Sequence, residues 1–367
     1  MKAFYISAGG FSLVNDRLYN ALQESWAGSL ERLDALEVAF AGRPLARLAA
    51  TLSTICYYHR VIAKHRIPPR DLIVRMPIFQ RCLSDRIGSL VKGASWTLQT
   101  QSLFDASCKG IPHFVFTDHT FRANRRYKGQ RATWPVPSAW LRMEEELYKN
   151  SALVFSTSGF AATSMVEDYG ISCERAPVTW SGCNVDPPAS VPQRSGKMRR
   201  ILFVGVEWER KGGPVLVEAF SRLRAQFPEL ELDVVGCEGK QEGIRFHGRL
   251  KPSDMQPFFE KADIFCLPSI AEPSAVALTE ASGFGLPVVA TRVGGSPERV
   301  LEGETGLLVE PSNVEELCGA IQFLIKNPEA ARKMGVAGRE RVLRDFTWDA
   351  VAAKILGQIR SIVPNSP

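Results

Sequence analysis

The sequence predicts an α/β protein with two doubly wound, Rossmann-like parallel-sheet domains that face each other across a cleft. Three observations lead to this prediction. Short apolar strands alternate with amphipathic helices along residues 199–345, which is the pattern of βαβ units. Residues 1–186 repeat the alternation less regularly, and residues 187–198 between them are rich in Pro, Ser and Gly, as linkers are. A chain of 367 residues also suits two domains better than one.

The N-terminal half begins with an apolar strand that is followed by two glycines, Gly9 and Gly10. Apolar and β-branched runs predict its strands at Lys2–Ser7, Leu72–Met76, Trp96–Gln101, His113–Thr117 and Leu153–Thr157. Residues 29–40 fit neither a strand nor a helix clearly, so their structure stays open.

The C-terminal half alternates more regularly. Strands are predicted at Arg200–Val206, Glu231–Gly236, Ile244–Phe246, Asp263–Leu267, Leu286–Thr291 and Gly306–Val309, and helices at Pro214–Phe227, Pro252–Lys261 and Ser274–Gly283. From Asn313 on the pattern is helical. Residues 346–367 are expected to form a last helix that crosses back to the first domain.

The composition, 45% hydrophobic and 23% charged, is typical of a globular protein with ample core. No run of 18 apolar residues predicts a membrane span, and residues 1–10 lack a signal-peptide pattern. The eight cysteines form no C-x-x-C pair, and most of them lie in apolar surroundings and look like core residues in a reducing compartment. We therefore expect a cytoplasmic protein, with a peripheral position at the inner membrane face as the alternative.

Several kinds of site are not expected. The five histidines form no ligand cluster, and no two aspartates are separated by a single residue, so no metal site is predicted. No G-x-G-x-x-G follows a predicted strand, and no G-x-x-x-x-G-K-[ST] occurs. These absences argue against a nicotinamide enzyme and against a P-loop ATPase.

Positive charge is concentrated in the N-terminal half. Residues 1–195 contain 23 Lys and Arg against 16 Asp and Glu, whereas residues 196–367 contain 22 against 23. The excess indicates an anionic partner, such as an acidic glycan, a lipid phosphate or a membrane surface. No nucleic-acid reading motif is recognised, so nucleic acid is not an expected partner.

Within that half, residues 43–70 combine apolar and basic residues. The apolar ones recur near helical spacing (Leu45, Leu48, Leu52, Ile55 and Ile62), and basic ones flank them (Arg43, Arg47, Arg60, Lys64, Arg66 and Arg70). A basic amphipathic helix can lie on an anionic membrane. An ordinary helix packed on the core would show the same pattern, and the sequence leaves both alternatives open.

The stretch from Pro268 to Thr291 is the most informative part of the chain. A buried-looking strand is followed by a turn that contains Glu272 and by an apolar helix that contains Glu280. In an open α/β sheet, ligands bind at the carboxyl ends of the strands, and a helix N-terminus there attracts a phosphate. Carboxylates beside that phosphate would accept hydrogen bonds from sugar hydroxyls.

Lys211 follows another predicted strand and opens a glycine turn. A lysine at that place can reach a diphosphate as a point charge. Gly212 and Gly213 let the backbone approach closely. The turn therefore indicates a second part of an anion site.

Residues 201–350 resemble the C-terminal domain of the family-4 retaining glycosyltransferases, a group 1 family with the GT-B fold. The matching pieces, in order, are Phe203-Val-Gly205, Arg210-Lys-Gly-Gly213, Phe246-His-Gly248, Ala262-Asp263, Pro268-Ser269, Glu272-x7-Glu280, Gly285-Leu-Pro-Val-Val289, Gly294-Gly295, Glu298 and Gly306-Leu-Leu-Val309. The N-terminal half matches more loosely, through Thr117-Asp-His119, the stretch from Ser156 to Gly170, and Gly182-Cys-Asn-Val185.

The resemblance implies roles for particular residues. Lys211 would stabilise the leaving nucleoside diphosphate, Glu280 would bind the donor ribose, and Glu272 would face the transferred sugar. His119 would contact that sugar from the first domain. The remaining donor-binding residues would be Gly9 and Gly10 in a loop over the diphosphate, Gly205 at a strand end, and the backbone N–H groups of Ser274, Ala275 and Val276. Arg122, Arg125 and Arg126 would face an anionic acceptor or simply face water.

One position departs from the family pattern. The family carries an arginine directly after the Val-Gly strand end, where this chain has Val206. Arg210, next to Lys211, is the candidate replacement and the fourth expected catalytic residue beside His119, Glu272 and Lys211.

The implied reaction moves a hexose from a nucleoside-diphosphate sugar to an acceptor hydroxyl with retention of configuration, in polysaccharide or glycoconjugate synthesis. The nucleotide sugar is a co-substrate, and no permanently bound cofactor is expected. The acceptor would be a glycan, a lipid-linked molecule or a small molecule. Two alternatives stay open: a nucleotide-sugar epimerase of the same fold, and a non-catalytic protein that binds sugar nucleotides.

Overall fold

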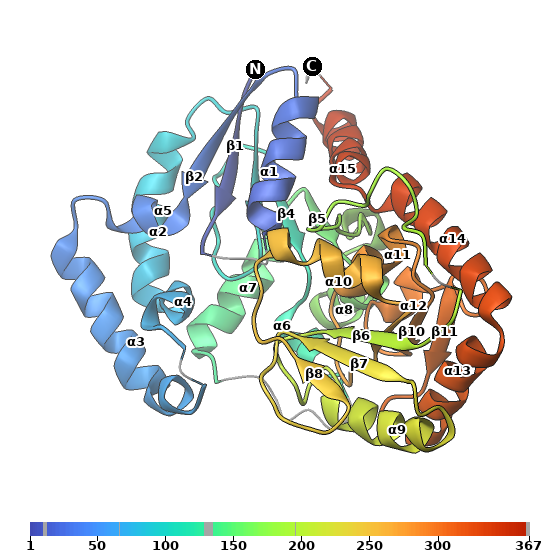
Figure 1. Cartoon of the computed structure of the whole chain (residues 1–367). Coiled ribbons are helices and arrows are strands. Elements are labelled where there is room, and N and C mark those ends of the chain that lie inside the picture. Colours follow the sequence, from blue (N-terminus) through green and yellow to red (C-terminus); the bar gives the residue numbers. More distant parts are fainter. Residues whose placement is uncertain (10–12, 66, 128–134, 195, 365–367) are drawn as a thin grey trace. The chain divides into compact units, whose positions relative to one another are not determined.

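The computed structural model describes residues 1–9, 13–65, 67–127, 135–194 and 196–364. The chain divides into two compact units. Unit 1 comprises Met1–Arg126, Arg131–Thr179 and Ala352–Pro367, and unit 2 comprises Tyr127–Gln130 and Trp180–Val351. Each unit is built around one parallel sheet with helices packed beside it (Figure 1).

The sheet of unit 1 has five strands in the order β2-β1-β3-β4-β5, and all of its pairings are parallel. Its strands are β1 (Lys2–Ser7), β2 (Ser29–Asp34), β3 (Trp96–Thr100), β4 (His113–Thr117) and β5 (Leu153–Ser156). Its helices are α1 (Val14–Ser25), α2 (Ala35–Phe40), α3 (Pro44–His65), α4 (Pro69–Leu72), α5 (Pro77–Leu90), α6 (Phe121–Asn124), α7 (Ser138–Asn150) and α8 (Gly159–Tyr169), with 3₁₀ turns η1 (Ile73–Arg75) and η2 (Cys173–Arg175).

The sheet of unit 2 has six strands in the order β11-β10-β9-β6-β7-β8, and it too is parallel throughout. Its strands are β6 (Arg200–Val204), β7 (Glu231–Val235), β8 (Ile244–Phe246), β9 (Ile264–Leu267), β10 (Val288–Thr291) and β11 (Gly306–Val309). Its helices are α9 (Gly213–Gln226), α10 (Gln256–Lys261), α11 (Val276–Gly283), α12 (Ser296–Arg299), α13 (Val314–Lys326) and α14 (Pro328–Asp345), with the 3₁₀ turn η3 (Pro252–Asp254).

The strand order of unit 2 places a topological switch point between β6 and β9. The chain runs from β6 outward through β7 and β8, then returns to the other side of β6 and continues outward through β9, β10 and β11. The loops that follow β6 and β9 therefore leave the sheet in opposite directions. A crevice at the carboxyl ends of such a strand pair is where open α/β sheets bind ligands.

Burial explains why the strands formed where the sequence predicted them. The central strands β6 and β9 are buried on both faces; Ile201, Phe203, Ile264 and Phe265 have no exposed surface. Parallel strands covered by helices on both sides need such continuous apolar runs. The predicted strands Lys2–Ser7, His113–Thr117, Ile244–Phe246 and Gly306–Val309 are confirmed to the residue.

One predicted strand is wrong. Leu72–Met76 forms the end of α4 and the turn η1 instead of a strand. Its apolar side chains are buried, as expected, but Pro69 and Pro77 stand at the first positions of α4 and α5. Proline at these positions favours the start of a helix. Periodicity alone does not distinguish a short buried helical segment from a buried strand.

The stretch left open by the sequence contains both kinds of element. Residues 29–34 form β2, which pairs with β1, and residues 35–40 form α2. Asp34 separates them, because its carboxylate accepts hydrogen bonds from the N–H groups of Leu36 and Glu37 and so caps α2.

The two units divide the chain at Thr179, before the residue 186 expected from composition. Packing accounts for the difference: Trp180 lies 5.1 Å from Phe346, ring centre to ring centre, and Val185 belongs to the core of unit 2. The last helix, α15 (Trp348–Ile362), begins in unit 2, and from Ala352 on its residues group with unit 1. None of the described helices has the length and apolar content that a membrane span would require.

Candidate active site

Lys211 and Glu272 meet at the switch point of unit 2. Lys211 lies in the loop after β6, and Glu272 lies in the loop after β9. The Lys211 ammonium is 2.5 Å from Oε2 of Glu272, and both side chains are largely buried, with 14% and 5% exposed. The hydroxyl of Ser269 donates to the same carboxylate oxygen over 3.0 Å. The two motifs that the sequence singled out are therefore joined directly.

Glu272 is held as a carboxylate despite its burial. Burial alone would raise the pKa of its carboxyl group, but the charges of Lys211 and Arg210 and the hydrogen bonds from Lys211 and Ser269 outweigh that effect and lower the pKa. The group consequently remains an acceptor at neutral pH. An ionised acceptor of this kind suits hydroxyl groups as ligands.

Glycines let the loops after β6 and β9 touch. Gly212 has a φ of +75°, and a Cβ atom there would lie 1.9 Å from the carbonyl oxygen of Pro268. A Cβ on Gly205 would lie 2.9 Å from Cγ of Lys211. Gly205 and Gly212 therefore let Lys211 and its loop pack closely against the second loop.

The first turn of α11 is closed partly by Glu272. Its Oε1 accepts the N–H group of Ala275 over 3.2 Å, so one of the three N–H groups expected to meet a phosphate already has a partner within the protein. Ser274, the residue before, lies with its hydroxyl 3.0 Å from that of Ser181. Val276 is the first residue of α11.

Glu280 lies on α11 and is 7% exposed. Its Oε1 accepts the backbone N–H group of Asn184 over 3.1 Å. The segment 180–185 thus has two hydrogen bonds to this region, one to Ser274 in the loop before α11 and one to Glu280 on α11.

Arg210 lies beside the Lys211–Glu272 pair, but its side chain is bound to other residues. Its guanidinium forms an ion pair with Glu207 and donates to the carbonyl oxygen of Ala271 over 2.7 Å. Val206, which stands where the family has an arginine, is 51% exposed. The Arg210 charge still acts on the Glu272 carboxylate.

The sequence did not predict that Arg299 and Ser181 lie together beside the loop before α11. Arg299, at the end of α12, is 4% exposed and donates to the carbonyl and hydroxyl oxygens of Ser181 over 3.1 and 2.9 Å. Burial lowers the pKa of this guanidinium to about 10, so it remains charged at neutral pH. The two residues are far apart in the sequence and belong to no local motif, so no sequence signal joined them.

The residues expected from the first half lie at the carboxyl edge of the sheet of unit 1. Gly9 follows β1 and has a φ of +65°, and its carbonyl oxygen accepts from the amide of Asn15 over 2.9 Å. Gly10 lies outside the described residues. His119 follows β4, is 9% exposed, and its ring stacks on Phe160 with ring centres 5.9 Å apart.

Two of the three arginines after His119 are engaged within unit 1. Arg122 pairs with Glu145 and lies over the ring of Tyr169. Arg126 pairs with Asp168 over 2.8 Å. Arg125 is exposed, whereas Arg122 and Arg126 are half-buried.

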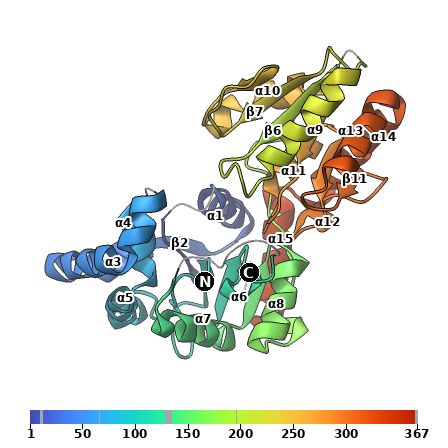
Figure 2. The same ribbon diagram turned by 90° about the horizontal axis from the view of Figure 1, so that it is seen from below.

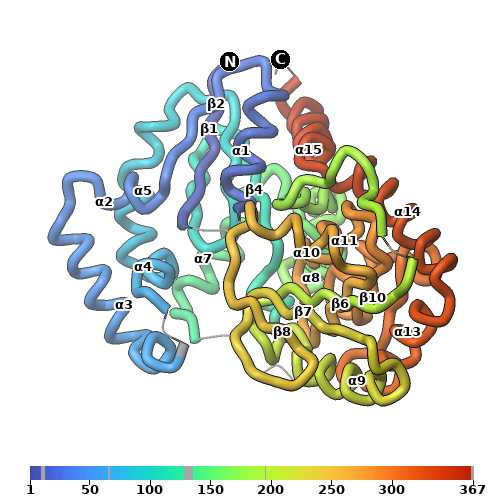
Figure 3. The backbone as a smooth tube through the Cα atoms, viewed as in Figure 1, coloured from blue at the N-terminus to red at the C-terminus, as the bar shows by residue number. Residues whose placement is uncertain are grey.

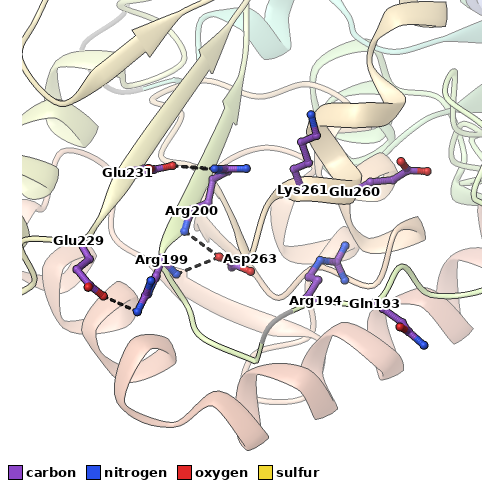
Figure 4. Close-up of a pocket in the computed structure, with 9 residues that line it drawn as sticks. All are labelled: Gln193, Arg194, Arg199, Arg200, Glu229, Glu231, Glu260, Lys261 and Asp263. Carbon is purple, nitrogen blue, oxygen red and sulfur yellow. Dashed lines mark hydrogen bonds and ion pairs between the residues drawn. The ribbon is translucent and has the colours of Figure 1, made fainter.

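A separate hollow of unit 2 lies at the amino ends of the strands, whereas Lys211 and Glu272 follow their carboxyl ends (Figure 4). Its volume is about 500 Å³, and it is lined by Arg200 at the start of β6, Glu231 at the start of β7 and Asp263 just before β9. These residues bind one another: Arg200 pairs with Glu231 over 2.9 Å, and Asp263 accepts the backbone N–H group of Arg200. We assign no ligand to it.

Residues 190–341 match the family model of the glycosyl transferases group 1. The chain belongs to this family. The match covers β6 to α14 and so contains Lys211, Glu272 and the whole of α11.

Comparisons beyond the family model agree with this assignment. The chain is 30% identical over 284 residues to a glycogen synthase of Mycobacterium tuberculosis, a stretch that covers 72% of this chain and 66% of that protein. Its fold is similar to that of a sucrose-phosphate synthase from Thermosynechococcus elongatus, with a TM-score of 0.75, 19% identity and full coverage of both chains. It is also similar to Anabaena HepE in complex with UDP-glucose, with a TM-score of 0.68, 15% identity and coverage of 98% and 100%. The fold is therefore GT-B.

The residue before α11 has a strained backbone. Ala275 is 1% exposed and adopts a φ of +53°, a left-handed conformation that costs a residue with a side chain about 1–2 kcal/mol. We expect Ala275→Gly to raise the free energy of unfolding by up to about 1 kcal/mol, because glycine adopts this conformation without strain but loses more backbone entropy. Urea unfolding measures the change. Ala281→Gly in the interior of α11 is the matched control, which should lower stability by about 1 kcal/mol or more; equal losses in both variants would contradict the strain.

Proposed function

We propose that the protein is a retaining glycosyltransferase that moves a hexose from a nucleoside-diphosphate sugar to an acceptor hydroxyl, in the synthesis of a polysaccharide or glycoconjugate. The observation that carries this proposal is the buried Lys211–Glu272 pair beside the first turn of α11. It joins a cation, an ionised acceptor and a helix start at the switch point of a parallel sheet. A diphosphate with a sugar attached needs these three groups close together.

In this proposal the positively charged groups of the site bind the leaving diphosphate. Lys211 shares its charge between Glu272 and the bound phosphate, and the first turn of α11 offers N–H groups and the positive end of its dipole. Both stabilise the negative charge that develops as the sugar–phosphate bond breaks. Gly212 lets the loop after β6 pack directly against Pro268, and this contact holds Lys211 at the place where the diphosphate would bind.

The carboxylates take the sugar hydroxyls. Glu280 accepts from the donor ribose, and Glu272 accepts from a hydroxyl of the transferred sugar. The contact of His119 with the transferred sugar stays a prediction, and Arg125 is the candidate for an anionic group on the acceptor. The acceptor itself is a glycan, a lipid-linked molecule or a small molecule.

Retention follows from attack on the face that the diphosphate leaves. Double displacement would require a carboxylate within reach of the anomeric carbon on the opposite face. In this proposal Glu272 is occupied by Lys211, Ser269 and a sugar hydroxyl, which leaves it poorly suited as a nucleophile. The departing phosphate oxygen takes the proton of the acceptor hydroxyl as the new bond forms. The UDP-glucose bound by HepE, a protein of similar fold, supports a nucleotide sugar as the donor.

A screen of nucleotide sugars tests the proposal. A donor should raise the unfolding temperature, since a ligand that binds the native state stabilises it, and it should be hydrolysed slowly without an acceptor. With an acceptor, nuclear magnetic resonance should show the donor's anomeric configuration in the product. Conversion of one nucleotide sugar into an isomer would favour the epimerase. Binding without turnover of any donor would favour the non-catalytic protein, for which Val206 is the one specific observation.

Arg210 is expected to supply the guanidinium that Val206 does not. Arg210→Ala should lower kcat about tenfold or more, because one charged donor to the leaving diphosphate is lost. The measurement is initial-rate kinetics at saturating donor. Arg332→Ala, on the exposed side of α14, is the matched control and should leave kcat unchanged. Unchanged turnover in Arg210→Ala, beside a collapse in a Lys211 variant, would remove Arg210 from the mechanism.

A further inference from the structure

Helix α3 lies at the outer margin of unit 1. Its main neighbours in the described part of unit 1 are α2, α4, α5 and η1 (Figure 3). Seen from below, it again stands at the margin, with α4 and α5 on its inner side (Figure 2). One whole face of the helix is therefore left without cover from the described part of unit 1.

The uncovered face is the apolar one. Its large aliphatic side chains follow a stripe of helical spacing, the α3 stripe, and they are 80%, 55%, 54% and 41% exposed: Leu45, Leu48, Leu52 and Ile55. The inward face is formed by Ala50, Thr54 and Tyr58, which have no exposed surface. An ordinary surface helix has the reverse arrangement, with its large apolar residues packed on the core. Of the two alternatives that the sequence left open, the core-packed helix does not hold for these four residues.

The charges carried by α3 itself have one sign. Arg47, Arg60 and Lys64 are exposed on this helix, and no acidic residue occurs from residue 41 to residue 70. Arg43, just before the helix, pairs with Asp85 of α5 over 3.2 Å. A helix with an exposed apolar row and only cations of its own complements a surface that is apolar inside and anionic at its rim.

We propose that α3 docks unit 1 onto an anionic lipid bilayer. The α3 stripe enters the boundary between headgroups and acyl chains, and Arg47, Arg60 and Lys64 contact lipid phosphates. Helices of this kind lie in the plane of the interface, and cations near an anionic membrane each add to the attraction. The helix does not meet the requirements for a membrane span, which agrees with a helix that lies on the surface.

A second copy of this chain is a poorer occupant. Two α3 helices packed stripe to stripe would bring Arg60 and Lys64 of each toward a surface that has no carboxylate on the helix to pair with them. The docking proposal is also independent of the proposed activity, because every residue of the α3 stripe lies in unit 1, whereas Lys211 and Glu272 lie in unit 2.

Co-sedimentation with lipid vesicles tests the apolar part. The full-length protein should bind vesicles of phosphatidylglycerol and phosphatidylcholine, and bind vesicles of phosphatidylcholine alone much more weakly. The double variant Leu48→Ser/Leu52→Ser should lose about tenfold or more in partition coefficient, because two exposed leucines no longer leave water. Its matched control, Phe323→Ser/Leu343→Ser, removes two residues of unit 2 that are 42% and 48% exposed and should bind as the unmodified protein does.

Charge reversal tests the basic part. Arg60→Glu/Lys64→Glu should weaken binding to anionic vesicles by about fivefold or more per position, and rising salt should weaken binding of the unmodified protein in the same direction. Lys326→Glu/Arg332→Glu, at exposed positions of unit 2, is the control. Since all four residues are exposed, urea unfolding midpoints should stay close to that of the unmodified protein.

Cys56 reports insertion directly, because it is exposed on α3 four residues after Leu52. An environment-sensitive dye on Cys56, in a Cys173→Ser background that removes the other exposed thiol among the described cysteines, should shift to the blue on anionic vesicles. The proposal is overturned if anionic vesicles neither bind the protein nor shift the dye. It is likewise overturned if Leu48→Ser/Leu52→Ser binds vesicles undiminished, or if sedimentation equilibrium shows a dimer that only this variant dissociates.

Discussion

Lys211→Met is expected to lower kcat of sugar transfer about a hundred- to a thousandfold. The Lys211 ammonium is the cation closest to the ionised Glu272, and we propose that it stabilises the departing diphosphate. Losing one preorganised donor to a developing negative charge costs catalysis of that order in other enzymes. Initial rates with the donor found by screening measure the effect. Lys326→Met, at the exposed end of α13, should change kcat less than twofold.

The same substitution is expected to destabilise the fold, and that effect must be separated from catalysis. Without Lys211, Glu272 is a buried carboxylate that has lost its nearest cation, which costs about 3–5 kcal/mol when a buried pair is broken. Adding Glu272→Gln removes the stranded charge, so the double variant Lys211→Met/Glu272→Gln should regain much of the stability. It should not regain activity. If the double variant regained both stability and activity, Lys211 would stabilise the fold and have no role in catalysis.

The pH dependence gives a second signature of this pair. In the unmodified protein the pKa of Glu272 is depressed, so its stabilising contribution is present above the ordinary pKa of glutamate and is lost as pH falls through the lower native value. In Lys211→Met, burial acts with less opposition and raises that pKa, so the native state binds the proton more readily than the unfolded chain. The difference in free energy of unfolding between the unmodified protein and Lys211→Met should therefore become smaller as pH falls toward 4.

Gly212→Ala is expected to lower the free energy of unfolding by about 3 kcal/mol or more. An alanine at a φ of +75° costs about 1–2 kcal/mol. Its Cβ would also lie 1.9 Å from the carbonyl oxygen of Pro268, so the loops after β6 and β9 would have to move apart, at a cost of about 1–3 kcal/mol. Because this separation displaces Lys211 from Glu272, nucleotide binding should fall as well.

Urea unfolding and nucleotide titration measure the two effects. Gly319→Ala is the matched control, because Gly319 is exposed within α13, has no atom within 4 Å of an added Cβ, and lies in a helix interior. This variant should gain about 0.5–1 kcal/mol. A Gly212→Ala protein as stable as the unmodified one would show that the two loops are not in close contact.

The sequence was most informative where burial and local pattern coincide. The strands β6 and β9 are continuous apolar runs because both of their faces are covered, so their positions, and the loops that carry Lys211 and Glu272, could be predicted. The run Leu72–Met76 is also apolar and buried, but prolines on either side favour helical starts, and this local competition decided against the strand.

Two features depend on packing and could not be predicted. The contact of Arg299 with Ser181 joins segments that are close only once unit 2 has folded, and neither residue stands in a recognisable pattern. The orientation of α3 is decided by which face packs on α4 and α5. The periodicity of its apolar residues does not say whether the apolar face packs on the protein or lies outside it. In the structure Ala50 and Tyr58 are buried and Leu45 is exposed.

A crystal structure of the protein grown with uridine or guanosine diphosphate tests the central claim most directly. We expect the diphosphate within hydrogen-bonding distance of Lys211 and the first turn of α11, with the ribose hydroxyls on Glu280. A saturating diphosphate that leaves the Lys211–Glu272 pair untouched, or that binds at another place in the molecule, would contradict the account.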